Sequence, residues 1–488
     1  MAIKIIRIFL SIGVFTLAGV AVMRLINRKG LLKCGIAFEA ALGFLLGMGV
    51  ISLQMFFYSL ASVRFGFLNI SIPWLLLFVL SFFVRERQNA ACQLNLMGEG
   101  IFKGKGLISF VLFAIISLQV VYAFVYAAIM PVSAWDSWAI WFFKAKAFYV
   151  ERAVSPGFLM NSEYSYDHPE YPNLAPLSLA FVYLTAGGVE DALAKLLYPA
   201  KQLAMLVVFY CALKRVFSAR PALVFTAVLS LTPIIVIHAS GVGSGLGGLY
   251  AGDFTGYADL MLSVCFLCAG VFIYLSASAY EAGAQEAGVH AMLAAFFLAM
   301  GAWTKNEGLI FAFAGAVILI VSAASSRGDW PGRAFAIIAA LAAFILPWAL
   351  FKGALGLKTE FAGRASIDVL AGNAERLAPI VKNMLFYMFG KVSLYNFIWW
   401  AYALSGILNL RAGLRMPLLG LNALILLQLS LYAFAYMITP SDVNWHLATS
   451  LDRVLMQVSP LAMLVASLNL GAVLRLGKKA GQGQGILS

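Results

Sequence analysis

The sequence predicts an all-α protein, a polytopic bundle of transmembrane helices. Of its 488 residues, 62% are hydrophobic and 11% are charged, and the mean hydropathy is +0.91. So apolar a composition is typical of an integral membrane protein and not of a soluble one. The apolar runs are unbroken and do not alternate with polar residues. Backbone groups in lipid need internal hydrogen bonds, so these runs are expected to form helices and not a barrel.

About 13 apolar windows are expected to cross the membrane. They are residues 5–23, 36–60, 67–84, 107–131, 196–213, 221–239, 258–279, 289–303, 308–324, 334–351, 392–410, 416–437 and 454–474. A further apolar piece, 174–187, is too short for a crossing and is predicted to be a juxtamembrane or re-entrant helix. The first window lacks a small-residue cleavage site, and we expect it to remain in the mature chain. The Gly- and Gln-rich tail, 475–488, is predicted to be a disordered cytoplasmic segment.

Basic residues punctuate the ends of the windows, which explains the formal charge of +13 without a nucleic-acid partner. In this topology 18 of the 34 basic residues lie in short loops on one side, which the positive-inside rule makes cytoplasmic. Two long loops, 132–195 and 352–391, then lie on the outer side with most of the acids. Lys4 and Arg7 also fall outside, so the first window either has its N-terminus out or does not fully cross.

Other features narrow the class of protein. No phosphate-binding loop of the form G-x-x-x-x-G-K-[ST] is present, which argues against an ATP-driven pump. Cys34, Cys92 and Cys211 fall at cytoplasmic positions, so no extracytoplasmic disulfide is expected. Cys265 and Cys268 are one helical turn apart within an apolar window, where small-residue packing explains them better than metal binding.

The outer loop opens with the most informative run, Ala134-Trp-Asp-Ser-Trp-Ala-Ile-Trp-Phe-Phe-Lys-Ala-Lys-Ala-Phe-Tyr149. Asp136 suits a helix N-cap, but a carboxylate at a membrane surface also suits a general base. The two interpretations are compatible. The aromatic residues of the run can stack on a sugar, although tryptophan and tyrosine are also common at membrane interfaces.

A second motif in the same loop is Tyr166-Asp-His-Pro-Glu-Tyr-Pro, which contains His168 and Glu170. The prolines favour a stiff, extended turn that holds both side chains in fixed directions. A solvated turn would look similar, and proximity to Asp136 is what favours substrate binding.

Charged residues also mark three later helix ends. Lys305 and Glu307 lie between two short windows, either in an outward turn or at membrane depth, where ionisable groups usually serve a site. Arg453 is a candidate clamp for a lipid phosphate, the alternatives being a pair with Asp452 or snorkelling to head groups. The remaining candidates on the outer side are His446 for the donor phosphate and Asp253 and Asp259 for the substrate.

These motifs together resemble the GT-C superfamily of polytopic glycosyltransferases, such as protein O-mannosyltransferases and lipid A aminoarabinose transferases. The similar parts are the Asp136 run, the His168-Pro-Glu-Tyr-Pro turn, Gly256-Tyr-Ala-Asp259, Thr304-Lys-Asn-Glu-Gly308 and the Arg453 helix. They divide the chain into an N-terminal transmembrane extension, 1–106, a GT-C-like catalytic region, 107–474, and the tail. About three spans precede the acidic loop, whereas in that family the loop usually follows the first.

The resemblance implies transfer of a sugar from a polyprenyl-phosphate carrier to an envelope lipid, polysaccharide or protein. Asp136 would act as base, Lys305, His446 and Arg453 would hold the donor phosphate, and the active site would face the periplasm or exterior from a bacterial inner membrane. Many family members pair two acids in this loop, but Ser137 follows Asp136 here. Metal-independent transfer is therefore expected; no cofactor is expected and a divalent metal is not indicated.

Two other classes of protein remain open. A multi-span transporter or lipid flippase predicts charges along a mid-membrane pathway and inverted repeats, and no clear repeat is found. A non-catalytic membrane partner in envelope assembly is the other alternative. The most informative observation for choosing among these classes is an outward-facing cavity that contains Asp136, Lys305 and Arg453 together.

Overall fold

The computed structural model describes residues 2–32, 35–84, 106–241, 255–325 and 330–483. These residues form helices joined by turns, with no strand among them. The expected all-α class is therefore confirmed. The long, apolar helices make this an integral membrane protein.

Ten helices in the described residues are long and apolar enough to cross a membrane. They are α1 (Ala2–Ile26), α2 (Ile36–Leu60), α4 (Leu107–Ile129), the segment Asp191–Lys214 made of α8 (Asp191–Ala194) and α9 (Leu197–Lys214), α12 (Asp259–Glu281), α13 (Ala287–Thr304), α14 (Glu307–Ala324), α15 (Trp330–Ala354), α21 (Leu418–Ile438) and α22 (Val443–Gly483). Each coincides with one of the predicted windows.

The other three predicted windows are not single long spans. Residues 221–239 form α10 (Ala219–Ser230) and α11 (Pro233–Ser240), which meet at 64°. Proline at the start of α11 cannot donate a helical hydrogen bond, which explains the break. Residues 67–84 form the shorter α3 (Phe67–Val84).

Residues 392–410 are broken into three pieces, α18 (Val392–Tyr395), α19 (Ile398–Leu408) and α20 (Leu410–Gly413). Asn396 has a positive φ of 51°, which interrupts the helix there. The predicted re-entrant piece is α7 (Leu174–Ala186), a buried helix of 13 residues. Near the C-terminus, α22 extends to Gly483, so the first part of the predicted disordered tail is helical, and residues 484–488 lie outside the described residues.

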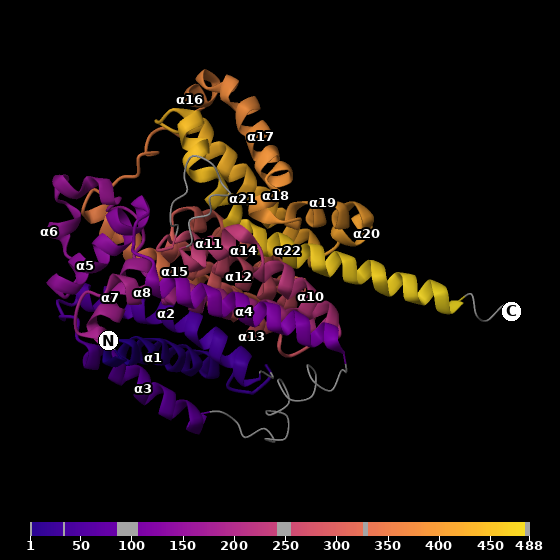
Figure 1. Cartoon of the computed structure of the whole chain (residues 1–488), viewed down its shortest axis with the longest axis horizontal. Coiled ribbons are helices and arrows are strands. Elements are labelled where there is room, and N and C mark those ends of the chain that lie inside the picture. Colours follow the sequence, from indigo (N-terminus) through magenta and orange to yellow (C-terminus); the bar gives the residue numbers. More distant parts are fainter. Residues whose placement is uncertain (1, 33–34, 85–105, 242–254, 326–329, 484–488) are drawn as a thin grey trace.

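Both long loops contain helices. In the first lie η2 (Asp136–Trp141), α5 (Phe142–Glu151), α6 (Pro156–Leu159) and η3 (Ser162–Asp167); in the second lie α16 (Ile367–Gly372), η4 (Ala374–Arg376), α17 (Leu377–Leu385) and η5 (Phe386–Gly390). Figure 1 shows α1 to α3 along one side of the bundle and α16 and α17 on the opposite side. Nearly all of α12 and of the membrane part of α22 is buried, so these two helices form the centre. We call the end of the bundle that carries residues 132–195 the loop end.

The N-terminus of α1 lies at the loop end. Lys4 forms an ion pair with Glu190, and Arg7 Nη1 donates to the carbonyl of Ala186 at 3.0 Å. These contacts agree with the predicted topology, in which the two basic residues share a side with the first long loop. They also tie α1 to α7 and α8.

Small residues allow α1 and α2 to touch along their backbones. A Cβ added at Gly47 would lie 1.7 Å from the carbonyl oxygen of Phe15, and one added at Gly19 would lie 1.9 Å from that of Gly43. Without an attraction between apolar helices in lipid, such close backbone contact is a main source of helix association.

Gly47→Ala should therefore separate α1 from α2 and destabilise the fold by about 1–3 kcal/mol, the usual cost of overpacking. Thermal unfolding of the purified protein in detergent measures the effect as a lower midpoint. The matched control is Gly13→Ala in α1, where no atom lies within 4 Å of the added carbon. Equal midpoints for the two variants would contradict this packing.

Candidate functional site

Asp136 begins η2, a wide helical turn that continues directly as α5. The next residue, Ser137, is buried and donates a hydrogen bond of 2.6 Å to the carbonyl of Thr255. Gly256 follows with a φ of +106°, and a Cβ there would lie 2.5 Å from Ser137 Oγ. Only glycine readily adopts this conformation at so close an approach. Position 137 is thus packed against the turn before α12 and has room only for a small residue. This packing explains why a serine, and not a second acid, follows Asp136.

The carboxylate of Asp136 is bound by Arg453 from α22. Arg453 Nη1 lies 2.5 Å from Asp136 Oδ2, and the two side chains are 14% and 25% exposed. The guanidinium also lies over the ring of Tyr257, 4.7 Å from its centroid. Asp452 instead accepts a hydrogen bond from the backbone N–H of Arg453 at 2.7 Å. Arg453 therefore turns toward Asp136, although its Nε has no hydrogen-bond partner among the described residues.

A second group of charges joins α12, the α13–α14 turn and α22. Lys305 Nζ lies 3.1 Å from Asp259 Oδ1 and 3.0 Å from Glu307 Oε1. Gln457 Nε2 donates to the same Asp259 oxygen at 2.5 Å. Burial alone would lower the pKa of Lys305, but the two carboxylates raise it above its ordinary value, so this side chain is a cation at neutral pH.

The His168–Tyr171 turn is fixed by stacking. His168 has a positive φ of 53°, and its carbonyl accepts from the Tyr171 N–H at 3.0 Å. The two rings are nearly parallel with centroids 4.7 Å apart, and Trp141 of η2 stacks on Tyr171 at 5.8 Å. His168 Nδ1 lies 3.4 Å from Glu170 Oε1. Burial, and then the carboxylates of Glu307 and Glu170, raise the pKa of Tyr171, so its hydroxyl stays protonated and can donate.

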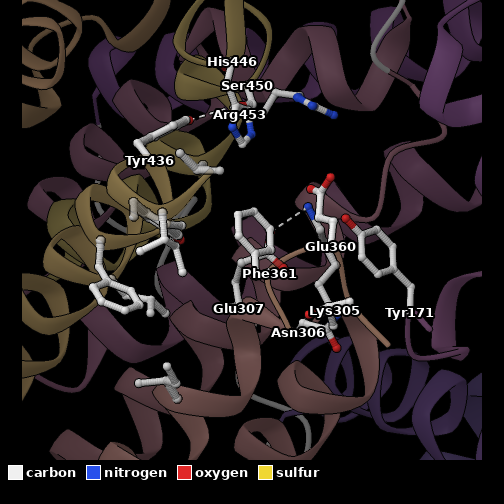
Figure 2. Close-up of a pocket in the computed structure, with 18 of the residues that line it drawn as sticks. Tyr171, Lys305, Asn306, Glu307, Glu360, Phe361, Tyr436, His446, Ser450 and Arg453 are labelled. Atoms are coloured by element: carbon white, nitrogen blue, oxygen red, sulfur yellow. Dashed lines mark hydrogen bonds and ion pairs between the residues drawn. The ribbon is translucent and has the colours of Figure 1, made fainter. Parts of the chain in front are cut away.

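Many of these groups line one cavity of about 310 Å³ at the loop end. This volume is near the lower size limit of small-molecule sites. Figure 2 shows Arg453, His446, Ser450 and Tyr436 on one side and Lys305, Asn306 and Tyr171 on the other. The predicted site residues that line it are Asp136, Glu170, Asp259, Lys305, Glu307, His446 and Arg453. His168 is not among the lining residues, and Asp253 lies outside the described residues. The cavity thus brings Asp136, Lys305 and Arg453 together.

Sequence reasoning missed several residues of the cavity. Glu360 and Phe361 enter from the second long loop, and Tyr436 lies near the end of α21 with its hydroxyl 2.8 Å from Ser450 Oγ. Gln457 is not among the lining residues, but it is buried one helical turn after Arg453 and holds the cavity residue Asp259. A glutamine inside the last apolar window was the one available signal, because a buried amide needs partners.

One ion pair lies behind the cavity. Lys144 of α5 is fully buried 4.0 Å from Asp167, whose carboxylate oxygens have no hydrogen-bond partner among the described residues. Burial raises the pKa of Asp167 to about 6, although Lys144 and His168 oppose this and Glu170 adds to it. Burial lowers the pKa of Lys144 to about 8 against the pull of Asp167 and Glu170.

Comparison with protein-family models, with curated proteins and with solved structures finds no match. The resemblance to the GT-C superfamily therefore remains a hypothesis from the motifs. In the part of the chain that the structure describes, no group of three or more His, Cys, Asp or Glu side chains is arranged to hold a metal ion. The cavity contains the carboxylate of Asp136, the cations Lys305 and Arg453, and further carboxylate and hydroxyl groups.

The raised pKa of Asp167 predicts a specific pH dependence of stability. A folded-state pKa near 6, against 3.8 ordinarily, means that the folded protein holds this proton more tightly than the unfolded chain does. Its contribution to stability is complete below pH 3.8 and is lost as pH rises through about 6. Asp167→Asn should make the thermal unfolding midpoint depend less on pH between 3.8 and about 6. Glu163→Gln, an exposed change in the same η3, should not, and equal profiles would contradict the assignment.

Proposed function

We propose that this protein is a membrane glycosyltransferase that moves a sugar from a polyprenyl-phosphate carrier to an envelope acceptor, a lipid, polysaccharide or protein. The observation that carries the proposal is the composition of the cavity. Asp136 and two cations lie in the same space as a wall of apolar side chains. An amphiphilic substrate with an anionic head matches both halves.

The phosphate of the donor binds between Arg453 and Lys305. Arginine offers a planar fork that matches phosphate oxygens, and Arg453 lines the cavity. Lys305 supplies a compact charge from the facing wall, and His446 lies beside Arg453 on α22. Carboxylates hold both cations at the cavity before a ligand arrives, so the charges that meet the phosphate are already in place.

The carrier lipid lies against the apolar wall. This wall consists of side chains from α14, α21 and α22, namely Ile310, Leu431, Phe434, Ala435, Ile438 and Val454. A hydrocarbon chain placed there loses its contact with water at no polar cost. The same wall gives no reason to bind a nucleotide sugar.

The sugar and acceptor occupy the acidic part of the cavity. Glu170, Glu307 and Glu360 accept hydrogen bonds from hydroxyl groups, and Tyr171 donates one. Asp259 serves indirectly, because its carboxylate is already bound by Lys305 and Gln457. His168 supports the Tyr171 ring by stacking on it. The substrate role expected for Asp253 stays a prediction, because that residue lies outside the described residues.

Asp136 is the general base of an inverting displacement. The acceptor oxygen forms a bond to the anomeric carbon while the bond from that carbon to the phosphate oxygen breaks. The acceptor proton passes to Asp136, and the electron pair leaves with the phosphate, whose growing charge Arg453 and Lys305 stabilise. When the donor phosphate binds Arg453, it competes with Asp136 for the guanidinium and frees the carboxylate to act.

The decisive test gives purified protein a panel of radiolabelled polyprenyl-phosphate sugars together with envelope extract. Transfer of label from one donor is expected, and Asp136→Asn should lower its rate by about 10²- to 10⁴-fold, the usual share of general-base catalysis. The variant keeps the size of the side chain and an oxygen that accepts from Arg453. Its thermal unfolding midpoint in detergent reports whether loss of the anion disturbs the fold.

The matched control is Asp368→Asn, an exposed change in the first turn of α16, which should transfer at the wild-type rate. If a well-folded Asp136→Asn variant keeps full activity, Asp136 is not the base. If no donor is consumed while reconstituted vesicles move a lipid or solute across the bilayer, the protein is a transporter or flippase instead.

We further propose that the loop end faces the periplasm or exterior of a bacterial inner membrane. With the native cysteines replaced by alanine, a cysteine at the exposed Ser162 should react with an impermeant thiol reagent in intact cells. One at the exposed Ser325, at the other end of α14, should react only after permeabilisation. The reverse pattern would put the cavity on the cytoplasmic side.

A further inference from the structure

Lys144 is a wholly buried cation that has no part in the proposed chemistry. It lies on α5, outside the lining of the cavity. Its Nζ donates a hydrogen bond to the carbonyl oxygen of His168 and lies 5.8 Å from the centroid of the Tyr171 ring. A lysine that is buried away from water loses much hydration energy, so its position here needs compensating contacts.

Lys144 contacts the same turn as Trp141, which precedes it by three residues on the continuous η2–α5 helix. Residues three apart share a helix face. The rings of Trp141 and His168 both stack on the ring of Tyr171. The ammonium of Lys144 donates to the backbone carbonyl of His168 in the same turn. The helix that begins at Asp136 therefore also holds the turn that brings Glu170 and Tyr171 into the cavity.

The backbone contact is the informative one. The carbonyl of His168 accepts from both Tyr171 N–H and Lys144 Nζ, and the residue itself has a left-handed conformation that a non-glycine residue seldom adopts without support. A carbonyl oxygen has two lone pairs, and here both are used to hold one strained turn.

We propose that Lys144 is a positioning residue, which fixes the His168–Tyr171 turn through the His168 carbonyl and so sets the direction in which Glu170 and Tyr171 meet the sugar relative to Asp136. Its effect on catalysis rests on the proposed glycosyl transfer. Its effect on the turn does not.

The alternative is that Lys144 only neutralises Asp167. At 4.0 Å this ion pair is longer than a hydrogen bond, and the carboxylate has no hydrogen-bond donor among the described residues. The two roles separate when both charges are removed together, because Asp167 then needs no counter-ion while the His168 carbonyl still lacks its donor.

The experiment compares Lys144→Met, the double variant Lys144→Met/Asp167→Asn, and Lys146→Met as control. Lys146 is two residues along the same helix, partly exposed and paired with Asp191. Amide hydrogen exchange of a peptide covering 164–173 reports on the turn without substrate, and exchange in α12 reports on the whole fold. Donor turnover and KM report on catalysis.

We expect faster exchange at 164–173 in both Lys144 variants, with α12 and the control unchanged. The kcat should fall by about 10- to 100-fold, as for a small misplacement of a binding group. KM for the donor should change less than kcat, because Arg453 and Lys305, which hold the donor phosphate in the proposed mechanism, are untouched. Wild-type exchange and kcat in the double variant would overturn the proposal and leave only the counter-ion role. Faster exchange throughout α12 would also overturn it, by assigning Lys144 to global packing.

The two proposals fail separately. If the wild-type protein transfers no sugar from any donor, the glycosyltransferase proposal fails, and exchange at 164–173 still decides whether Lys144 holds the turn.

Discussion

The ion pair between Arg453 and Asp136 is the contact on which the site depends. It joins residues 317 positions apart, one at the start of the first long loop and one inside the central helix α22. A guanidinium that is only 14% exposed near lipid needs a nearby anion, because an isolated charge there is very costly. The pair therefore fixes where η2 sits on the bundle, and with η2 come α5 and the His168–Tyr171 turn. Asp259 and Lys305 meet the same requirement on the facing wall.

Both cations are thus already paired with carboxylates in the structure. A phosphate that binds them must compete with those carboxylates. Coulomb attraction in a partly desolvated cavity is strong, so the single charge of the donor phosphodiester competes with the carboxylate for the guanidinium. The phosphate gains a second negative charge as its bond to the sugar breaks, which strengthens this attraction. Lys305 has two carboxylate partners, Asp259 and Glu307, whereas the Arg453 guanidinium has one ion-pair partner among the described residues. Arg453 is therefore the cation more easily drawn to a ligand, and Asp136 is the carboxylate that such a move releases. In the proposed mechanism, binding of the donor and activation of Asp136 as base are then one event.

The sequence predicted the helical class and the location of the charged residues well, for one physical reason. Long apolar runs and charges at their ends are local features, so all ten long spans and the cavity residues Asp136, Lys305 and Arg453 could be found from composition and spacing. Tertiary partners could not. Nothing local indicates that Tyr257 lies under Arg453, that Gln457 binds Asp259, or that Lys144 binds the His168 carbonyl. The break at Asn396 was missed because hydropathy does not report a positive φ.

The second long loop was expected only as an outer segment, yet it completes the cavity. Side chains of Arg364, Asn373 and Arg376 donate to the carbonyls of Ile438, Met437 and Thr439 at the C-terminal end of α21. Those carbonyls have no helical partner and carry the negative end of the helix dipole, so cations and amides are favoured there. The loop is thereby attached to the helix that supplies the apolar wall, and Glu360 and Phe361 reach the cavity from it. The contacts at the end of α21 therefore fix the acidic loop residues beside the apolar side chains of the cavity. The amphiphilic substrate that we propose would contact both.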